Sequence, residues 1–121
     1  MKKFFFISLV VAFILSCGKD SLDFFIPNLS NNWENIADRD NEFFFFNYQD
    51  SANKSTFDGN ENTGNGDQFQ FAGSYENTGI EFTFLTGPRK DKTFRGNIDR
   101  NNPARMTIRS DSETLTLERQ P

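Results

Sequence analysis

Apolar and polar residues alternate along the chain from Asn41 onward, and this period of two is typical of β-strands with one buried face. In one run, Phe69, Phe71 and Tyr75 share one face, while mainly polar residues occupy the positions between them. Short segments rich in Gly, Asn, Asp and Pro, the usual residues of tight turns, separate such runs. The pattern predicts about seven strands, over residues 42–48, 55–61, 68–75, 80–84, 93–99, 104–109 and 114–118.

The short turns between these strands indicate how the strands are connected. Strands joined by tight turns must pair antiparallel, so the chain is expected to form a meander. A Phe-x-Gly motif, at 57–59, 71–73 and 94–96, places glycine on the same face as phenylalanine, where it either marks a strand end or lets the strand bend inward. We therefore predict an all-β antiparallel meander of about seven or eight short strands closed as a small barrel, with a β-sandwich as the alternative.

Trp33 precedes the first of these strands. Leu29, Trp33 and Ile36 fit one face of a short helix that Ser30 would cap. Small exported lipocalin-like domains instead carry a Trp near their first strand and an Arg near the end of the last strand that packs on it. Trp33 and Arg119 resemble that arrangement, although the glycine of the family's Gly-x-Trp sequence is missing. The resemblance implies a barrel, and a short helix near Trp33 stays an open alternative.

The first 16 residues have the order of a secretory signal peptide. Lys2 and Lys3 precede an apolar run over residues 4–15. A run of this length is too short for a comfortable membrane span, which takes about 20 apolar residues. An uncleaved anchor or a buried strand is the alternative to a signal peptide.

The only cysteine, Cys17, ends the sequence Ile14-Leu15-Ser16-Cys17, which resembles the lipobox of bacterial lipoproteins. The resemblance implies a diacylglycerol on the sulfur, cleavage before Cys17 and acylation of the new amino terminus. Two or three acyl chains, at about 0.8 kcal/mol per buried methylene, hold a protein stably on a membrane. In enterobacterial lipoproteins an Asp after the cysteine signals retention in the inner membrane, so Gly18 by resemblance implies the outer membrane. Lys19 and Asp20 resemble the charged signal that sends Bacteroidota-type lipoproteins to the cell surface. We expect a lipid-anchored outer-membrane protein whose barrel faces the periplasm or the cell surface.

The predicted organisation has three parts: a signal peptide (1–16), a lipidated cysteine with its tether (17–29), and a single barrel domain (30–121). Removal of the 16-residue signal leaves 105 of the 121 residues, and the loss of two lysines changes the formal net charge from −4 to −6. An acidic chain without a basic block disfavours binding to nucleic acid or to anionic lipid. The acyl chains are therefore expected to supply the membrane attachment.

Four consecutive aromatic residues, Phe43 to Phe46, place rings on both faces of one predicted strand. The outer rings need a cover or a partner, because exposed aromatic area on a small domain usually marks a contact. We take Phe43 and Phe45 as candidate contact residues of this strand. An ordinary core role is the alternative.

The acidic segment 58–67 is a second candidate contact surface, through Asp58, Glu61 and Asp67. Its beginning has the ligand spacing of an EF-hand calcium loop. Thr63 then stands where that loop needs glycine, and Phe69 where it needs a bidentate acid. We therefore expect a flexible hairpin loop and no metal site.

The chain contains no histidine, so neither a Cys-His couple nor a histidine base is available, and its acids lie in or beside predicted turns. We expect no catalysis, and no cofactor other than the covalent lipid on Cys17. The expected function is that of a noncatalytic binding or structural module of the cell envelope, with a protein or a small apolar ligand as partner. The alternatives are a lipocalin-like carrier of a small apolar ligand and an inhibitor of a basic envelope-attacking enzyme such as lysozyme.

Overall fold

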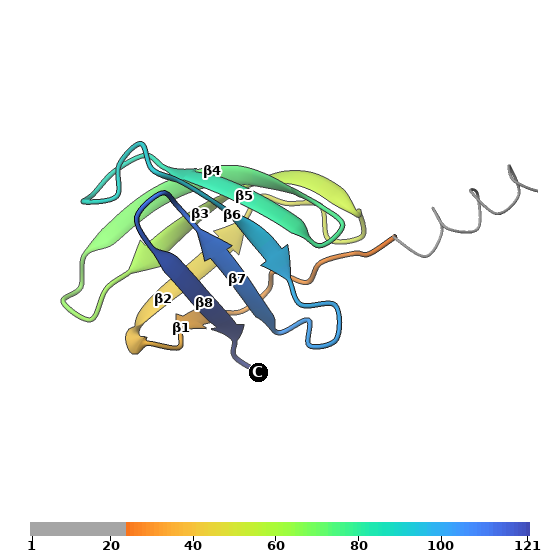
Figure 1. The fold of residues 1–121 in the computed structure, drawn as a ribbon, viewed down its shortest axis with the longest axis horizontal. Coiled ribbons are helices and arrows are strands. Elements are labelled where there is room, and N and C mark those ends of the chain that lie inside the picture. Colours follow the sequence, from red (N-terminus) through yellow and green to blue (C-terminus); the bar gives the residue numbers. More distant parts are fainter. Residues whose placement is uncertain (1–23) are drawn as a thin grey trace, which may run out of the picture.

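A computed structural model describes residues 24–121, and within this range it contains strands and connecting segments but no helix. Eight antiparallel strands pair in sequence order, and the first pairs with the last to close a barrel (Figure 1). The strands are β1 (Trp33–Asn35), β2 (Asp38–Phe46), β3 (Lys54–Asn62), β4 (Gln68–Glu76), β5 (Gly79–Phe84), β6 (Thr93–Ile98), β7 (Arg105–Arg109) and β8 (Thr114–Arg119). The predicted small barrel is confirmed. The predicted signal peptide, the lipobox and Cys17 lie outside the described residues.

The inner face of the barrel is apolar and densely packed with rings, as the alternating pattern predicts. The centroids of neighbouring core rings lie 4.4 to 6.5 Å apart, with Phe71 and Phe82 the nearest pair. An eight-stranded barrel is only just wide enough for its own side chains. The largest fully buried side chains include those of Trp33, Phe43, Phe71, Phe82, Phe84 and Phe94.

Two glycines of the Phe-x-Gly motif lie where neighbouring strands approach too closely for a side chain. A Cβ at Gly73 would overlap the carbonyl oxygen of Glu81 on β5, and a Cβ at Gly96 would overlap that of Thr107 on β7. Both glycines lie inside strands, so they do not mark strand ends. They let the sheet curve into a closed barrel, which is the role that the motif predicts.

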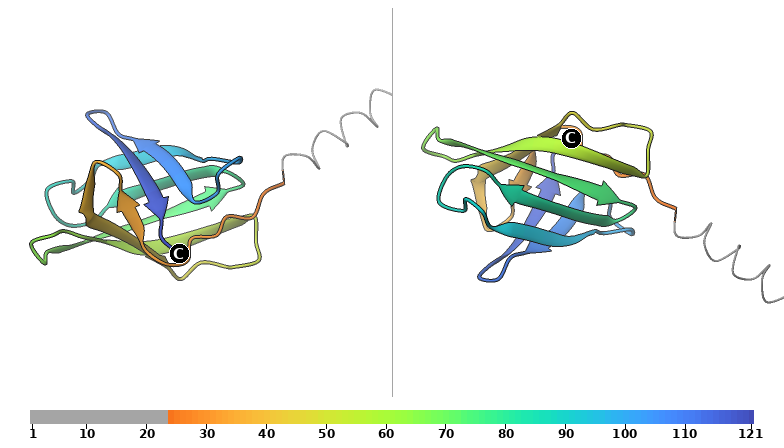
Figure 2. Two further views of the ribbon diagram at one scale, coloured as in Figure 1. Left: turned by 90° about the horizontal axis from the view of Figure 1, so that it is seen from below. Right: turned by 90° about the horizontal axis from the view of Figure 1, so that it is seen from above.

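Consecutive connections alternate between the two ends of the barrel. We call one end the hairpin end; it carries the connections 36–37, 63–67, 85–92 and 110–113. The other, the entry end, carries the connections 47–53, 77–78 and 99–104, the C-terminus and the described N-terminal segment. Figure 2 shows that this segment, drawn in orange, leaves the barrel opposite to the β3–β4 hairpin. The described chain therefore enters the barrel at one end, and the long hairpin marks the other.

Trp33 lies in a strand, so the alternative of a short helix around it is wrong. β1 pairs with β2 on one side and with β8 on the other, and Trp33 lies opposite Phe43 and Arg119. The indole is fully buried. Closure of the barrel through this three-residue strand outweighs the local helical spacing, because strand pairing on both sides satisfies its backbone groups.

The chain packs on the barrel before residue 30, the predicted start of the domain. Pro27 and Leu29 are fully buried, and Phe25 packs against the core. The Phe25 backbone N–H donates a hydrogen bond to Asn77 Oδ1 at 3.1 Å. The last part of the predicted tether is therefore part of the folded domain. No stretch within residues 24–121 forms a helix with the length and apolarity needed to cross a membrane.

Candidate functional site

The core changes from apolar to polar at the hairpin end of the barrel. Asn35, Asn41 and Glu61 occupy inward positions there, each two residues beyond an inward residue of the core on the same strand. Their exposed fractions are 7%, 7% and 3%. Buried polar groups are costly unless they are hydrogen-bonded, so this layer must satisfy its own groups.

The three side chains form a chain of hydrogen bonds. Asn35 Nδ2 donates to Asn41 Oδ1 at 3.2 Å, and Asn41 Nδ2 donates to Glu61 Oε2 at 2.6 Å. The same Glu61 oxygen accepts a hydrogen bond from Arg89 Nη1, also at 2.6 Å. The buried carboxylate is therefore held by one amide and one guanidinium group.

Arg89 reaches this layer from the 85–92 connection. Its Nε and Nη2 donate to the two carboxylate oxygens of Glu113, at 2.7 and 3.2 Å, so the guanidinium bridges two acids. The guanidinium also lies 5.8 Å from the centroid of the Phe84 ring. Gly87, with φ at +87°, lets the connection fold tightly onto the Phe69 ring, where a Cβ would overlap. Arg89 thereby links the long connection to the barrel rim.

A hollow of about 440 Å³ opens at this end of the barrel. It combines charged, amide, hydroxyl and apolar groups. Volumes of this size fall within the range of small-molecule sites, about 300 to 1,000 Å³. The hollow is lined by Asn35, Asp38, Asn41, Glu61, Thr63, Phe69, Pro88, Arg89, Lys92 and Glu113. We call it the end hollow.

The hydrogen bonds from Arg89 lower the pKa of the Glu113 carboxyl below its ordinary value of 4.5, although partial burial acts in the opposite direction. A lowered pKa in the folded state means that this group adds stability above pH 4.5 and loses it as the pH falls through the lowered value. We expect Glu113→Gln to make the free energy of unfolding less sensitive to pH as the pH falls below 4.5. Urea titrations of both proteins at several pH values measure this, and identical pH dependence would contradict the assignment.

Two of the predicted contact residues, Phe43 and Phe45, point into the barrel. Their exposed fractions are 0% and 7%, so the prediction that they form a contact surface does not fit the fold. The outward rings of β2 are those of Phe44, which is half-buried, and Phe46, which is 40% exposed. The inward rings are core, which was the alternative reading of this strand.

The three predicted acidic contact residues lie in different surroundings. Asp58 is exposed on the outside of β3, where it accepts a hydrogen bond from Asn47 Nδ2 at 3.0 Å. Asp67 is exposed in the connection 63–67. Glu61 is the buried acid of the end hollow. The hairpin loop is therefore shorter than expected, because β3 continues to Asn62, and the three acids do not share one surface.

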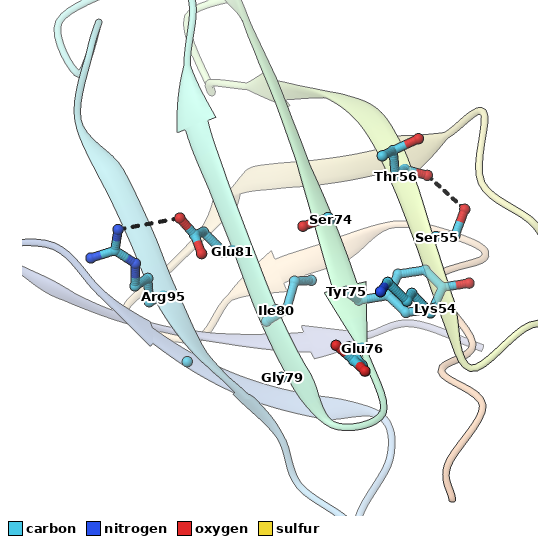
Figure 3. Close-up of a pocket in the computed structure, with 11 residues that line it drawn as sticks. Lys54, Ser55, Thr56, Ser74, Tyr75, Glu76, Gly79, Ile80, Glu81 and Arg95 are labelled. Carbon is cyan, nitrogen blue, oxygen red and sulfur yellow. Dashed lines mark hydrogen bonds and ion pairs between the residues drawn. The ribbon is translucent and has the colours of Figure 1, made fainter.

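A second hollow, of about 590 Å³, lies on the outer wall of the barrel across β3 to β6 (Figure 3). The side chains of Glu81 and Arg95 reach toward each other there, with 3.3 Å between Oε1 and Nη2. Both side chains are more than half exposed, and an exposed ion pair of this kind contributes little. We favour the end hollow as the functional site, because a buried charged group and several polar side chains converge in it.

The pattern of the sequence missed Asn35, Asn41, Arg89 and Glu113. A signal for Asn41 does exist in the sequence, since Asn41 continues the inward row of β2 at a spacing of two, as Glu61 continues that of β3.

Within residues 24–121, no three His, Cys, Asp or Glu side chains come together so as to hold a metal ion. Comparisons of the chain with protein-family models, with curated proteins and with solved structures found no match.

Proposed function

We propose that this protein is a lipid-anchored lipoprotein of the outer membrane whose barrel is a noncatalytic binding module. The sequence Ile14-Leu15-Ser16-Cys17 supports the lipid anchor, and the place where the chain enters the barrel supports an orientation for it. Phe24, the first described residue, belongs to the segment at the entry end, and Cys17 lies only seven residues before it. Seven extended residues span at most about 25 Å. A lipid on Cys17 therefore holds the entry end near the membrane and leaves the end hollow facing away from it.

The packing of the barrel favours a binding module over a carrier of a small apolar molecule. A carrier needs apolar space inside the barrel, and the axis is occupied by closely packed rings such as Phe45, Phe71 and Phe82. The polar end hollow instead offers a site at the surface. Inhibition of a basic enzyme such as lysozyme remains a prediction from the acidic charge.

The anchor is tested by comparing the protein with its Cys17→Ser variant, both produced from the full chain in a bacterium. We expect the mass of the unaltered protein to include an acylated cysteine, and Cys17→Ser to lower its membrane-bound fraction about tenfold or more. Intact mass spectrometry and membrane flotation measure these two quantities. An unmodified, freely soluble chain with an intact Cys17 would contradict the proposal.

The orientation is tested with one added cysteine at each end, because a lipidated Cys17 leaves the new thiol as the reactive one. Asn65→Cys lies in the hairpin-end connection 63–67, and Asn102→Cys lies in an entry-end connection; both residues are exposed. Each variant is labelled with a fluorophore and placed in vesicles that carry a quencher on their lipid headgroups. We expect stronger quenching of the label at residue 102, and equal or reversed quenching would contradict the orientation.

A further inference from the structure

The polar layer of the end hollow replaces what would be the simplest way to close a barrel. An apolar layer would continue the core at no electrostatic cost, whereas burial of a carboxylate and a guanidinium requires both to lose water. The Glu61 side chain is nevertheless buried, with an exposed fraction of only 3%, and Asn35 and Asn41 are buried beside it. The fold therefore carries three polar side chains at positions that its own packing does not require to be polar.

These side chains also keep hydrogen-bonding capacity unused. Both described hydrogen bonds to Glu61 end on Oε2, so within residues 24–121 its Oε1 has no donor. Asn41 Nδ2 has a second hydrogen beyond the one given to Glu61. Arg89 uses three of the five N–H groups of a guanidinium on Glu61 and Glu113. An acceptor and several donors are thus available side by side in the end hollow.

The charge of the end hollow indicates what it can accept. Three acids, Asp38, Glu61 and Glu113, face two cations, Arg89 and Lys92, so the signs are interspersed and nearly balanced. The three carboxylates would repel an anion, and the two basic groups would repel a cation, whereas an uncharged ligand avoids both repulsions. The lining therefore favours a neutral ligand that both donates and accepts hydrogen bonds.

The lining also includes apolar surface next to these polar groups. Phe69 lies directly opposite Glu61 in the β3–β4 register, and Pro88 precedes Arg89 in the 85–92 connection. A sugar ring has hydroxyl groups along its edge and C–H groups on its faces, so it matches polar groups beside an aromatic or proline ring. The volume of about 440 Å³ suits a ligand of one or two such rings.

We infer that the end hollow binds a neutral mono- or disaccharide, held by hydrogen bonds to Glu61, Asn41 and Arg89. This inference rests on the proposed function, since it names the ligand class of the binding module. The site faces away from the membrane in that proposal. It can therefore reach a saccharide at the end of a longer glycan as well as a free sugar.

The inference is tested by saturation-transfer NMR on the protein produced from the full chain, in phospholipid nanodiscs if it carries the lipid and in buffer if it does not. The probes are glucose, galactose, mannose, N-acetylglucosamine, maltose and cellobiose, each at about 10 mM, a concentration that detects millimolar affinity. We expect transfer to at least one of these sugars. Glu61→Gln, which removes the charge and keeps the shape, is expected to weaken that binding about tenfold or more.

A matched pair of bulky substitutions locates the binding and does not depend on buried residues. Lys92→Trp fills the end hollow from its exposed rim, whereas Lys54→Trp places the same side chain at the outer-wall hollow. We expect Lys92→Trp to abolish saccharide binding and Lys54→Trp to leave it unchanged, with thermal melting confirming that both variants fold.

Absence of transfer to all six sugars would overturn the inference, and so would loss of binding in Lys54→Trp alone. Either result is separate from the test of the anchor. A chain that is lipidated and oriented as proposed, yet binds none of the sugars, refutes the ligand class and leaves the lipoprotein proposal standing. A chain that binds a sugar but lacks the lipid refutes the lipoprotein proposal and leaves the ligand class standing.

Discussion

Gly73→Ala is expected to lower the free energy of unfolding by about 3 kcal/mol or more, because the added methyl group has no space. It would overlap the carbonyl oxygen of Glu81 and lie 2.6 Å from the Cα of Phe82. Both atoms belong to the backbone of β5, which pairs with β4 from Phe71 to Glu76. The clash can be relieved only by moving the strands apart and breaking part of this pairing. Urea titration of the full chain, followed by the fluorescence of Trp33, measures the loss.

Gly79→Ala is the matched control, since Gly79 lies on the strand that pairs with Gly73's strand. A Cβ added at Gly79 would lie 3.4 Å from its nearest neighbour, the Glu76 carbonyl oxygen, which is an ordinary contact. We expect this variant to change the free energy of unfolding by less than about 1 kcal/mol. Similar losses in both variants would mean that the general preference for glycine, and not the close approach of β4 and β5, determines the effect.

The barrel could be predicted from the sequence because two independent patterns agree. Alternation places one apolar face on every long strand, and the inward glycines at 73 and 96 provide the curvature that closure needs. Trp33 could not be assigned in the same way. A strand of three residues is too short to show a period of two, and its pairing with β8 is a contact between residues far apart in the chain.

The end hollow was only partly predictable. Glu61 is a candidate residue at the end of the predicted strand 55–61, but the acidic segment 58–67 around it suggests an exposed loop, whereas β3 continues to Asn62 and Glu61 points inward. The role of Arg89 has no signal in the local pattern. Its direction depends on a connection of eight residues in which Gly87 and Asp91 both have positive φ, and on acids from two other segments.

Phe45→Ala is expected to lower the free energy of unfolding by about 3 to 5 kcal/mol, the usual cost of removing a buried ring and leaving a cavity. The Phe45 ring lies 5.3 Å from the ring of Phe57 and 5.4 Å from that of Phe71, centroid to centroid, and 6.2 Å from that of Trp33. Because these neighbours belong to three other strands, they cannot all move in to fill the space. Urea titration measures the loss, and m, the dependence of the free energy on urea, should stay unchanged.

Phe46→Ala is the control for the same strand and the same residue type, one position further along. Its side chain points outward and is 40% exposed, so we expect a loss of less than about 1 kcal/mol. Equal losses would contradict the orientation of β2, since only a ring that is buried from water on folding can cost as much as Phe45. The difference between the two variants therefore separates core from surface within the run of four phenylalanines. Any contact made by this strand must then be sought at Phe44 and Phe46.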